Sequence, residues 1–201
     1  MAKRTSASLT DAEKFFRRAI GLDPKFALAY VGLADTLELQ TVYSGVPRVA
    51  VLTRAEQAVG TALQLDPNLG EAWASSANTA EALGRYDRVE PMFRRAIALN
   101  PNYATAYQWY GEMLTYSGRL EEGITSSEQA VELDPLSAIV NLSHGINLER
   151  AGRFDEAEAR YRRVIDIDPS MPVAYSMMGR LRAFALNRYA DAVPLMEKAV
   201  E

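Results

Sequence analysis

The hydrophobic and polar positions of this chain repeat with a period of 34 residues. Five prolines that follow Asp or Asn set the register, at successive spacings of 43, 34, 34 and 34 residues. These prolines are Pro24, Pro67, Pro101, Pro135 and Pro169. The first interval is nine residues longer than the others, which indicates one unit with an insertion. A fixed period of this length is typical of proteins built from small, stacked supersecondary units.

Small residues recur in the same register and predict two helices in each unit. The fifth residue before each proline is Ala19, Ala62, Ala96, Ala130 or Val164, and the tenth after it is Ala34, Ala77, Gly111, Gly145 or Gly179. Small and apolar residues at three- and four-residue intervals form one buried helical face. Midway between prolines lie Gly84, Gly118 and Gly152, where a helix is expected to end. Each unit is therefore predicted to be a helix, a short turn and a second helix.

The segment PNYATAYQWYGEMLTYSGRLEEGITSSEQAVELDP carries the whole pattern and resembles the tetratricopeptide repeat, a 34-residue helical hairpin. The resemblance extends from about Leu9 to Glu201. It implies an all-α fold in which antiparallel helix pairs stack into a right-handed α-solenoid.

The register divides the chain into a lone helix and five hairpins within a single array, residues 1–201. The predicted parts are residues 8–23 (a second helix alone), 25–66 (a repeat with an insert at 41–49), 68–100, 102–134, 136–168 (regular repeats) and 170–201 (a final, incomplete repeat). The insert is expected to separate the two helices of its repeat. The final unit has no central glycine and carries LNRYADA there instead, shifted by one residue.

The array opens in mid-unit and ends without a polar capping helix, although solenoids usually need caps. We therefore expect the chain to be a segment of a longer protein. The lengthened first repeat is similar, more weakly, to the repeat region of some bacterial multidomain signalling proteins. In those proteins the repeats follow an adenylate-cyclase-like, kinase or winged-helix domain.

The composition of the chain argues against several classes of catalytic, metal and nucleic-acid-binding site. The chain has 201 residues, a net charge of −4 and no cysteine, and His144 is its one histidine. Mild acidity disfavours a nucleic-acid surface, and the lack of thiols and of further imidazoles excludes cysteine nucleophiles and multi-histidine metal centres. No apolar stretch is long enough to span a membrane. We therefore expect no catalytic residues, no cofactor, no metal, no nucleic-acid or membrane partner, and a cytoplasmic location.

The first helices of the repeats are expected to line the concave side of the array. Positions 7, 8, 11 and 15 after each proline should point into this groove. The predicted binding residues are Asn78, Gln108, Trp109, Glu112, Tyr116, Ile146, Arg150, Met177, Arg180 and Phe184. Trp, Tyr and Arg often dominate interface energetics. The alternative for Trp109 is ordinary core packing against the neighbouring repeat.

Two further features lie outside this groove. Arginine pairs recur near the ends of second helices, at residues 17–18, 94–95 and 162–163. They could form a basic ridge for an acidic partner or a phosphate. We expect instead that they complement the helix dipole and lie near Asp23, Asp166 or Asp168. His144 occupies a position expected to face the core, as a neutral imidazole with one hydrogen bond.

The sequence therefore predicts a non-enzymatic module that binds a protein or peptide in the groove, as a regulatory or scaffolding segment. Two alternatives stay open. The segment belongs to a signalling enzyme or transcriptional regulator whose chemistry lies elsewhere, or it is a homodimerisation platform. Dimerisation would use apolar faces at the ends, formed by Ala12, Phe15 or Phe16, Ala19 and Ile20 at one end and by Leu195, Met196 and Ala199 at the other.

Overall fold

The structure is a computed structural model that describes residues 6–43 and 47–200. The chain divides into two compact units, residues 1–103 and 104–201, and each is described by itself. The boundary falls in the turn that precedes the helix beginning at Ala104.

Helices make up 81% of the structure, and no strand occurs in the described residues. In unit 1 the elements are α1 (Ser6–Leu22), α2 (Ala27–Tyr43), α3 (Arg48–Leu65), α4 (Gly70–Ala82), the short 3-10 helix η1 (Tyr86–Arg88) and α5 (Val89–Leu99). In unit 2 they are α6 (Ala104–Tyr116), α7 (Leu120–Leu133), α8 (Ala138–Arg150), α9 (Phe154–Ile167), α10 (Pro172–Phe184) and α11 (Tyr189–Lys198).

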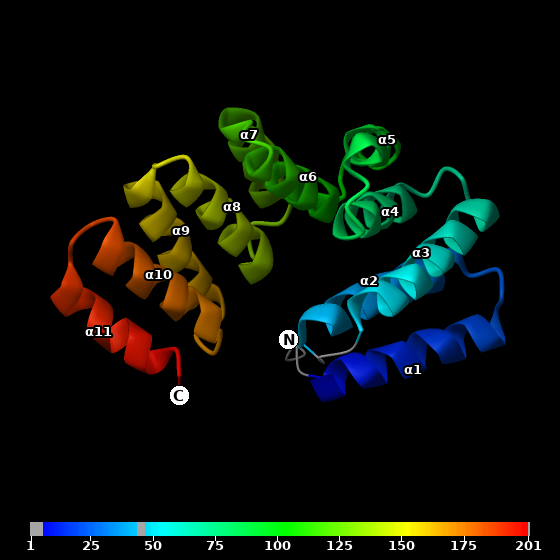
Figure 1. Cartoon of the computed structure of the whole chain (residues 1–201), viewed down its shortest axis with the longest axis horizontal. Coiled ribbons are helices and arrows are strands. Elements are labelled where there is room, and N and C mark those ends of the chain that lie inside the picture. The colour runs from blue at the N-terminus through cyan, green and yellow to red at the C-terminus, as the bar shows by residue number, and fades with distance from the viewer. Residues whose placement is uncertain (1–5, 44–46, 201) are drawn as a thin grey trace. The chain divides into compact units, whose positions relative to one another are not determined.

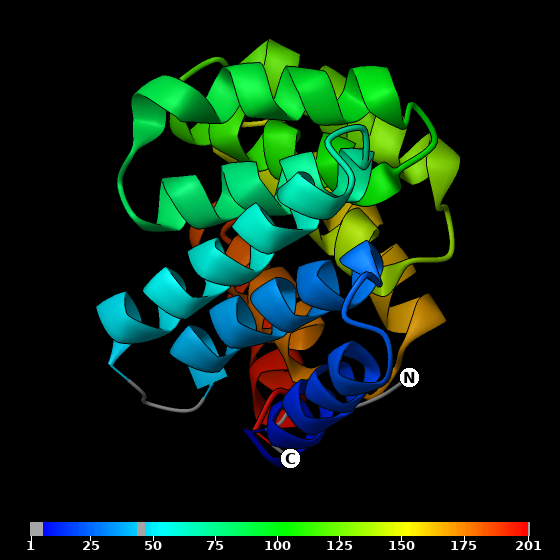
Figure 2. The ribbon, with the colours of Figure 1, turned by 90° about the vertical axis from the view of Figure 1, so that its right-hand side faces the viewer.

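Within each unit, helices that follow one another in sequence lie side by side (Figures 1 and 2). The pairs α2–α3 and α4–α5 in unit 1, and α6–α7, α8–α9 and α10–α11 in unit 2, are the expected hairpins, and α1 packs on α2. This confirms the predicted all-α fold of paired helices.

The turns that join one hairpin to the next explain why Asp or Asn precedes each proline. The side chain of Asp66 accepts a hydrogen bond from the backbone N–H of Asn68 at 2.9 Å, and Asp168 accepts one from Ser170 at 3.0 Å. Asp and Asn favour this local turn because a short side-chain oxygen can reach the N–H two residues on. Proline then supplies a fixed φ within the turn.

The sixth residue after the proline fastens the same turn to the next helix. The side chains of Tyr30, Trp73, Asn141 and Tyr175 each donate a hydrogen bond to the carbonyl of the proline six residues earlier, at 2.9–3.2 Å. The residue type changes along the chain, but a side-chain donor is kept. The aromatic preference at this position is therefore partly a requirement for an N–H or O–H donor.

The turns within the hairpins require a left-handed backbone conformation. Gly84, Gly118 and Gly152 have φ of 77°, 82° and 76°. In the final repeat Asn187 takes this role with φ of 55°, one residue later in the register. Asn is the residue type that tolerates this region best after Gly. The missing glycine of the last unit is thus replaced by the next most suitable residue.

Each unit has its own apolar core between its helices. The core of unit 1 includes Val31, Leu37, Val51, Val59 and Ala62, and that of unit 2 includes Leu142, Leu148, Tyr161, Val164 and Leu181. Glycine allows α8 and α9 to approach closely, because a Cβ on Gly145 would lie 2.7 Å from the ring of Tyr161. The small-residue positions predicted from the register are therefore contact points between helices.

The prediction that the insert separates two helices was wrong at its edges. Residues 41–43 extend α2, and α3 begins at Arg48, so these helices have 17 and 18 residues. The regular helices α6 and α7 have 13 and 14. The insertion is thus taken up mainly as about one extra turn on each helix. Residues 44–46 of the predicted insert lie outside the described residues.

The terminal helices are only partly uncovered. Phe16 and Ile20 of α1 pack on the core of unit 1, whereas Phe15 is 69% exposed. In α11, Leu195 packs on the core of unit 2, and Met196 is 38% exposed. The expectation that Leu195 is available at an open end was wrong, because it packs on the core of unit 2 beside Gly179 of α10.

Candidate functional site

The predicted groove residues lie on one side of the first helices of the hairpins. We call this side the inner face: in unit 1 it belongs to α2 and α4, and in unit 2 to α6, α8 and α10. Positions 8, 11 and 15 after each proline are three or four residues apart and so share a helical face.

Positions 8 and 11 of the inner face form hydrogen bonds between neighbouring first helices. In unit 1 the hydroxyl of Ser75 donates to the carboxylate of Asp35. In unit 2 the hydroxyl of Ser143 donates to Glu112, which also accepts from Gln108 Nε2 at 3.0 Å. The carboxylate at position 11 thus pairs with the serine at position 8 of the next repeat. These contacts join the repeats, and they occupy Gln108 and Glu112 within the fold.

A second carboxylate, Glu38, lies one turn from Asp35 on α2. It accepts hydrogen bonds from Asn78 Nδ2 at 2.5 Å and from Thr79 Oγ1 at 3.3 Å. Burial raises the pKa of Asp35 to about 6. Burial, and then the nearby Asp35 carboxylate, raise the pKa of Glu38 to about 8. Around neutral pH this part of the inner face therefore holds a proton on Glu38.

Position 15 is where the inner face of unit 2 is open. Tyr116, Arg150 and Phe184 occupy this position in α6, α8 and α10, and we call them the exposed row. Tyr116 is 63% exposed and Phe184 is 76% exposed. The guanidinium of Arg150 stacks over the Tyr116 ring, with its carbon 3.9 Å from the ring centroid. The row thus presents two aromatic rings and a cation that no core requires.

The other predicted residues are less exposed or held by contacts. Ile146 and Met177 pack at the margin of the unit 2 core. Arg180 forms an ion pair with Glu149 at 2.8 Å. Trp109 is half-buried, and its role as a binding anchor or as core stays a prediction. Asn78 donates to Glu38, as described above.

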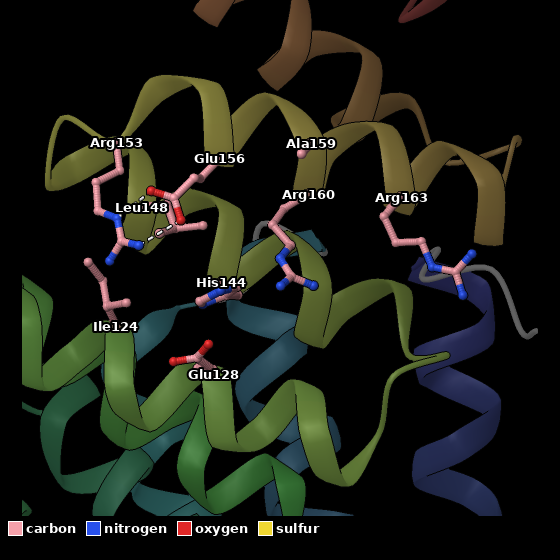
Figure 3. Close-up of a pocket in the computed structure, with 9 residues that line it drawn as sticks. All are labelled: Ile124, Glu128, His144, Leu148, Arg153, Glu156, Ala159, Arg160 and Arg163. Atoms are coloured by element: carbon pink, nitrogen blue, oxygen red, sulfur yellow. Dashed lines mark hydrogen bonds and ion pairs between the residues drawn. The ribbon is translucent and has the colours of Figure 1, made fainter.

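A cavity of about 370 Å³ lies on a different side of α8, between α7 and α9 (Figure 3). It is lined by Ile124, Glu128, His144, Leu148, Arg153, Glu156, Ala159, Arg160 and Arg163. No residue of the predicted groove lines it. The sequence offered one signal for it, the arginine pairs of the second helices.

His144 is buried, as predicted, and its Nδ1 lies 2.8 Å from Ser127 Oγ. Burial, followed by the positive charges of Arg160 and Arg153, lowers the pKa of His144 to about 4. The prediction of a neutral imidazole with one hydrogen bond is confirmed. The ring nevertheless borders the cavity, which the sequence did not indicate.

Three arginines of the recurrent pairs form ion pairs within their own helices. Arg17, Arg94 and Arg162 each pair with a glutamate four residues earlier, at 2.7–3.1 Å. Ion pairs at this spacing are ordinary features of helix surfaces. The first arginine of each pair is therefore held locally, and the second has a different environment in each repeat.

Among residues 6–43 and 47–200, no cluster of three or more His, Asp or Glu side chains could hold a metal ion. Within the same ranges, no helix is both long enough and apolar enough to cross a membrane.

Family models of the tetratricopeptide repeat match residues 70–113, 114–172 and 142–201. The chain belongs to the tetratricopeptide repeat family. Tetratricopeptide repeats are protein-interaction modules, and proteins built from them are generally non-catalytic scaffolds. No curated protein matches the sequence.

Solved structures of low sequence identity share the fold. YrrB, described as a TPR protein with an unusual peptide-binding site, is 23% identical, with 92% of this chain and 90% of YrrB covered and a TM-score of 0.59. MamA from Desulfovibrio magneticus RS-1 is 16% identical, with coverages of 85% and 93% and a TM-score of 0.64. The human IFIT1 dimer with m7Gppp-AAAA is 13% identical, with coverages of 96% and 46% and a TM-score of 0.78.

Proposed function

We propose that this chain binds an extended segment of a partner protein on the inner face of unit 2, centred on the exposed row. The observation that carries the proposal is the exposure of Tyr116, Arg150 and Phe184 at equivalent positions of three successive first helices. Aromatic and arginine side chains concentrate binding energy at interfaces. Here they stand outside the core, so the stability of the fold does not account for them.

The spacing of the row fits an extended peptide. Equivalent positions of stacked hairpins lie roughly 10 Å apart, the usual distance between packed helices. A peptide of six or seven residues at about 3.3 Å each would span the three positions. Tyr116 and Arg150 are already stacked on each other, so little side-chain freedom is lost on binding. YrrB, with its described peptide-binding site, supports a peptide as the occupant.

The proposal is tested with peptides selected from a random display library against the intact chain. Phe184→Ala and Tyr116→Ala should each weaken the selected peptide by about tenfold or more in a fluorescence anisotropy titration. Thermal melts should change little, because both rings are mostly exposed.

The matched control is Tyr86→Ala, which removes another exposed ring, 69% exposed, from η1 and off the inner face. This variant should bind the peptide like the unaltered chain. Equal losses for Tyr86→Ala and Phe184→Ala, or no loss for either row variant, would refute the assignment of the inner face.

We further propose a regulatory or scaffolding role within a larger protein. The extended first repeat, α2 and α3, is the feature that resembles the repeat regions of bacterial signalling proteins. In a protein of that kind, the module would recruit a partner for a catalytic or DNA-binding domain. Deleting the module from the parent protein should then abolish partner recruitment and leave any catalytic turnover intact.

Self-association through the terminal helices is a second candidate function. Phe15 in α1 and Val200 beyond α11 are 69% and 87% exposed, and Met196 adds to the C-terminal patch. Exposed apolar patches of a few hundred Å² mark interaction sites. Light scattering over a concentration series decides: a mass constant at 22.2 kDa rules out this candidate. A dimer lost in Phe15→Glu or in Met196→Glu would locate the contact.

A further inference from the structure

The cavity between α7 and α9 has charged walls and a histidine on its floor (Figure 3). Gly145 permits the close contact of α8 and α9 that shapes the site, since a Cβ there would also lie 3.2 Å from the Cβ of Arg160. His144, the preceding residue, is thereby held close to Arg160. The relative position of His144 and Arg160 is therefore set by the packing of α8 on α9.

Two arginines of this cavity form no hydrogen bond or ion pair in the described part of the chain. The glutamate that would pair with Arg160 at the helical spacing of four is Glu156, but Arg153 binds both oxygens of Glu156, at 2.6 Å each. Four residues before Arg163 stands Ala159, where Arg162 has Glu158. Neither Arg160 nor Arg163 forms an ion pair or hydrogen bond with a residue that the structure describes.

The hydrogen bonds of His144 define what its free nitrogen offers. Ser127 Oγ lies 3.0 Å from the carbonyl oxygen of Ile124 and 2.8 Å from His144 Nδ1. We assign the hydroxyl proton to the carbonyl, so that the oxygen accepts from Nδ1. Nδ1 therefore carries the ring proton. Nε2 is left with a lone pair and needs a donor. A ligand here must supply acceptor oxygens to the arginines and an O–H or N–H to the histidine.

We propose that this cavity binds a phosphate monoester group. A monoprotonated phosphate has anionic oxygens for Arg160 and Arg163 and one O–H for Nε2 of His144. A carboxylate satisfies the arginines alone, because it has no proton to donate. Arginine forms strong, charge-assisted hydrogen bonds with phosphate oxygens. The volume, about 370 Å³, is at the lower end of the range for small-ligand sites.

The other charged residues of the lining determine on which side of the cavity the phosphate lies. Arg153 and Glu156 neutralise each other on α9, and Glu128 on α7 carries the one other negative charge of the lining. The phosphate must therefore lie on the α9 side. Glu128 would accept a hydrogen bond from the group that carries the phosphate, such as a backbone N–H of a phosphorylated segment. This site shares no residue with the inner face and does not rest on the function proposed there.

The single histidine makes binding directly observable in the intact chain. Inorganic phosphate, blocked phosphoserine and sulfate are titrated at pH near 5.5, below the second pKa of about 6 of a phosphate monoester, and the imidazole signals are followed by NMR with ionic strength held constant by chloride. Phosphate and phosphoserine should shift the His144 signals saturably and raise its pKa, because the bound anion offsets the arginine charges. Sulfate, which has no proton at this pH, should bind at least several-fold more weakly.

Two variants locate the site. Arg160→Gln should weaken phosphate binding about tenfold or more, since it removes a charge-assisted hydrogen bond at an unpaired side chain. The control is Arg18→Gln, which removes an exposed arginine of α1 that lies outside the cavity and forms no ion pair with a residue that the structure describes. This variant should bind phosphate normally. Both should melt like the unaltered chain.

The two phosphate probes separate the sources of the ligand. Tighter binding of blocked phosphoserine assigns the site to phosphorylated protein segments, and tighter binding of inorganic phosphate assigns it to the free ion. Equal shifts with sulfate would overturn the assignment to a protonated phosphate. Unshifted His144 signals, or equal binding by Arg160→Gln and the unaltered chain, would overturn the site itself.

Discussion

Replacing Glu38 with glutamine should stabilise the protein at neutral pH and leave its stability nearly unchanged in acid. Glu38 is ionised in the unfolded chain above its ordinary pKa of 4.5, but in the fold its pKa is about 8. A raised pKa contributes stability that is fully present below pH 4.5 and is lost as pH rises through 8. At neutral pH the free energy of unfolding is lower by on the order of 3 kcal/mol, since each pH unit above the ordinary pKa costs about 1.4 kcal/mol.

Glutamine keeps the shape and acceptor oxygen of Glu38 but cannot ionise. The amide oxygen can keep the hydrogen bond from Asn78, and the amide N–H can donate to Thr79 Oγ1, which in the unaltered chain donates to the second oxygen of Glu38, while the cost of a buried charge disappears. The variant should gain roughly 2–3 kcal/mol in the free energy of unfolding near pH 7 and close to nothing near pH 4.5.

Urea unfolding followed by circular dichroism across this pH range measures the difference. The control is Glu71→Gln, since Glu71 also accepts a hydrogen bond from an asparagine, Asn100, at 2.8 Å, but has uncharged neighbours one turn further along α4. Its effect should not change with pH in the same way. A Glu38→Gln variant that is destabilised equally at every pH would refute the reasoning, because it would show that folding does not change the pKa of Glu38.

Three further outcomes follow from the contacts of single residues. His144 should make the fold less stable as pH falls from 6.5 to about 4, because its folded pKa is lowered and the unfolded chain binds the proton first; NMR titration of the imidazole and unfolding of His144→Gln check this. Asn187 and Gly118 both have positive φ, which glycine adopts without strain. Asn187→Gly should therefore raise the free energy of unfolding by a few tenths to about 1 kcal/mol, and Gly118→Ala should lower it by about 1–2 kcal/mol; thermal melts give the sign of each change. Glu158→Gln should lower the free energy of unfolding by roughly 3 kcal/mol, since it leaves the mostly buried Arg182, 2.5 Å away, without its counter-charge. Chemical unfolding measures the loss, and combining Glu158→Gln with Arg182→Met should recover part of it.

The repeat register was sufficient to predict the hairpins, because each turn reuses the same local chemistry. An Asp or Asn before proline and a left-handed residue at mid-unit are short-range requirements that a single sequence displays. Asn187 shows the limit of this reasoning: the absent glycine was visible, but its replacement one residue later was not. The extra residues of the first repeat were also located correctly, yet their helical conformation depends on packing between α2 and α3.

The candidate sites were less predictable because they depend on which polar groups are already occupied. Offsets from proline placed Glu112 and Tyr116 on one face, but only the structure shows Glu112 bonded to Ser143 while Tyr116 stays exposed. The cavity was missed for the same reason. In the sequence, Glu156 stands at the correct spacing to pair with Arg160, but only the fold shows that Arg153 binds Glu156 instead.

Site-specific photo-cross-linking tests the central claim, that partners bind the exposed row of unit 2. A photoreactive phenylalanine analogue replaces Phe184 in one sample and Tyr86 in another, and each is illuminated with a selected peptide. The account predicts peptide adducts from position 184 and none from position 86. Adducts at position 86 without adducts at position 184 would contradict it.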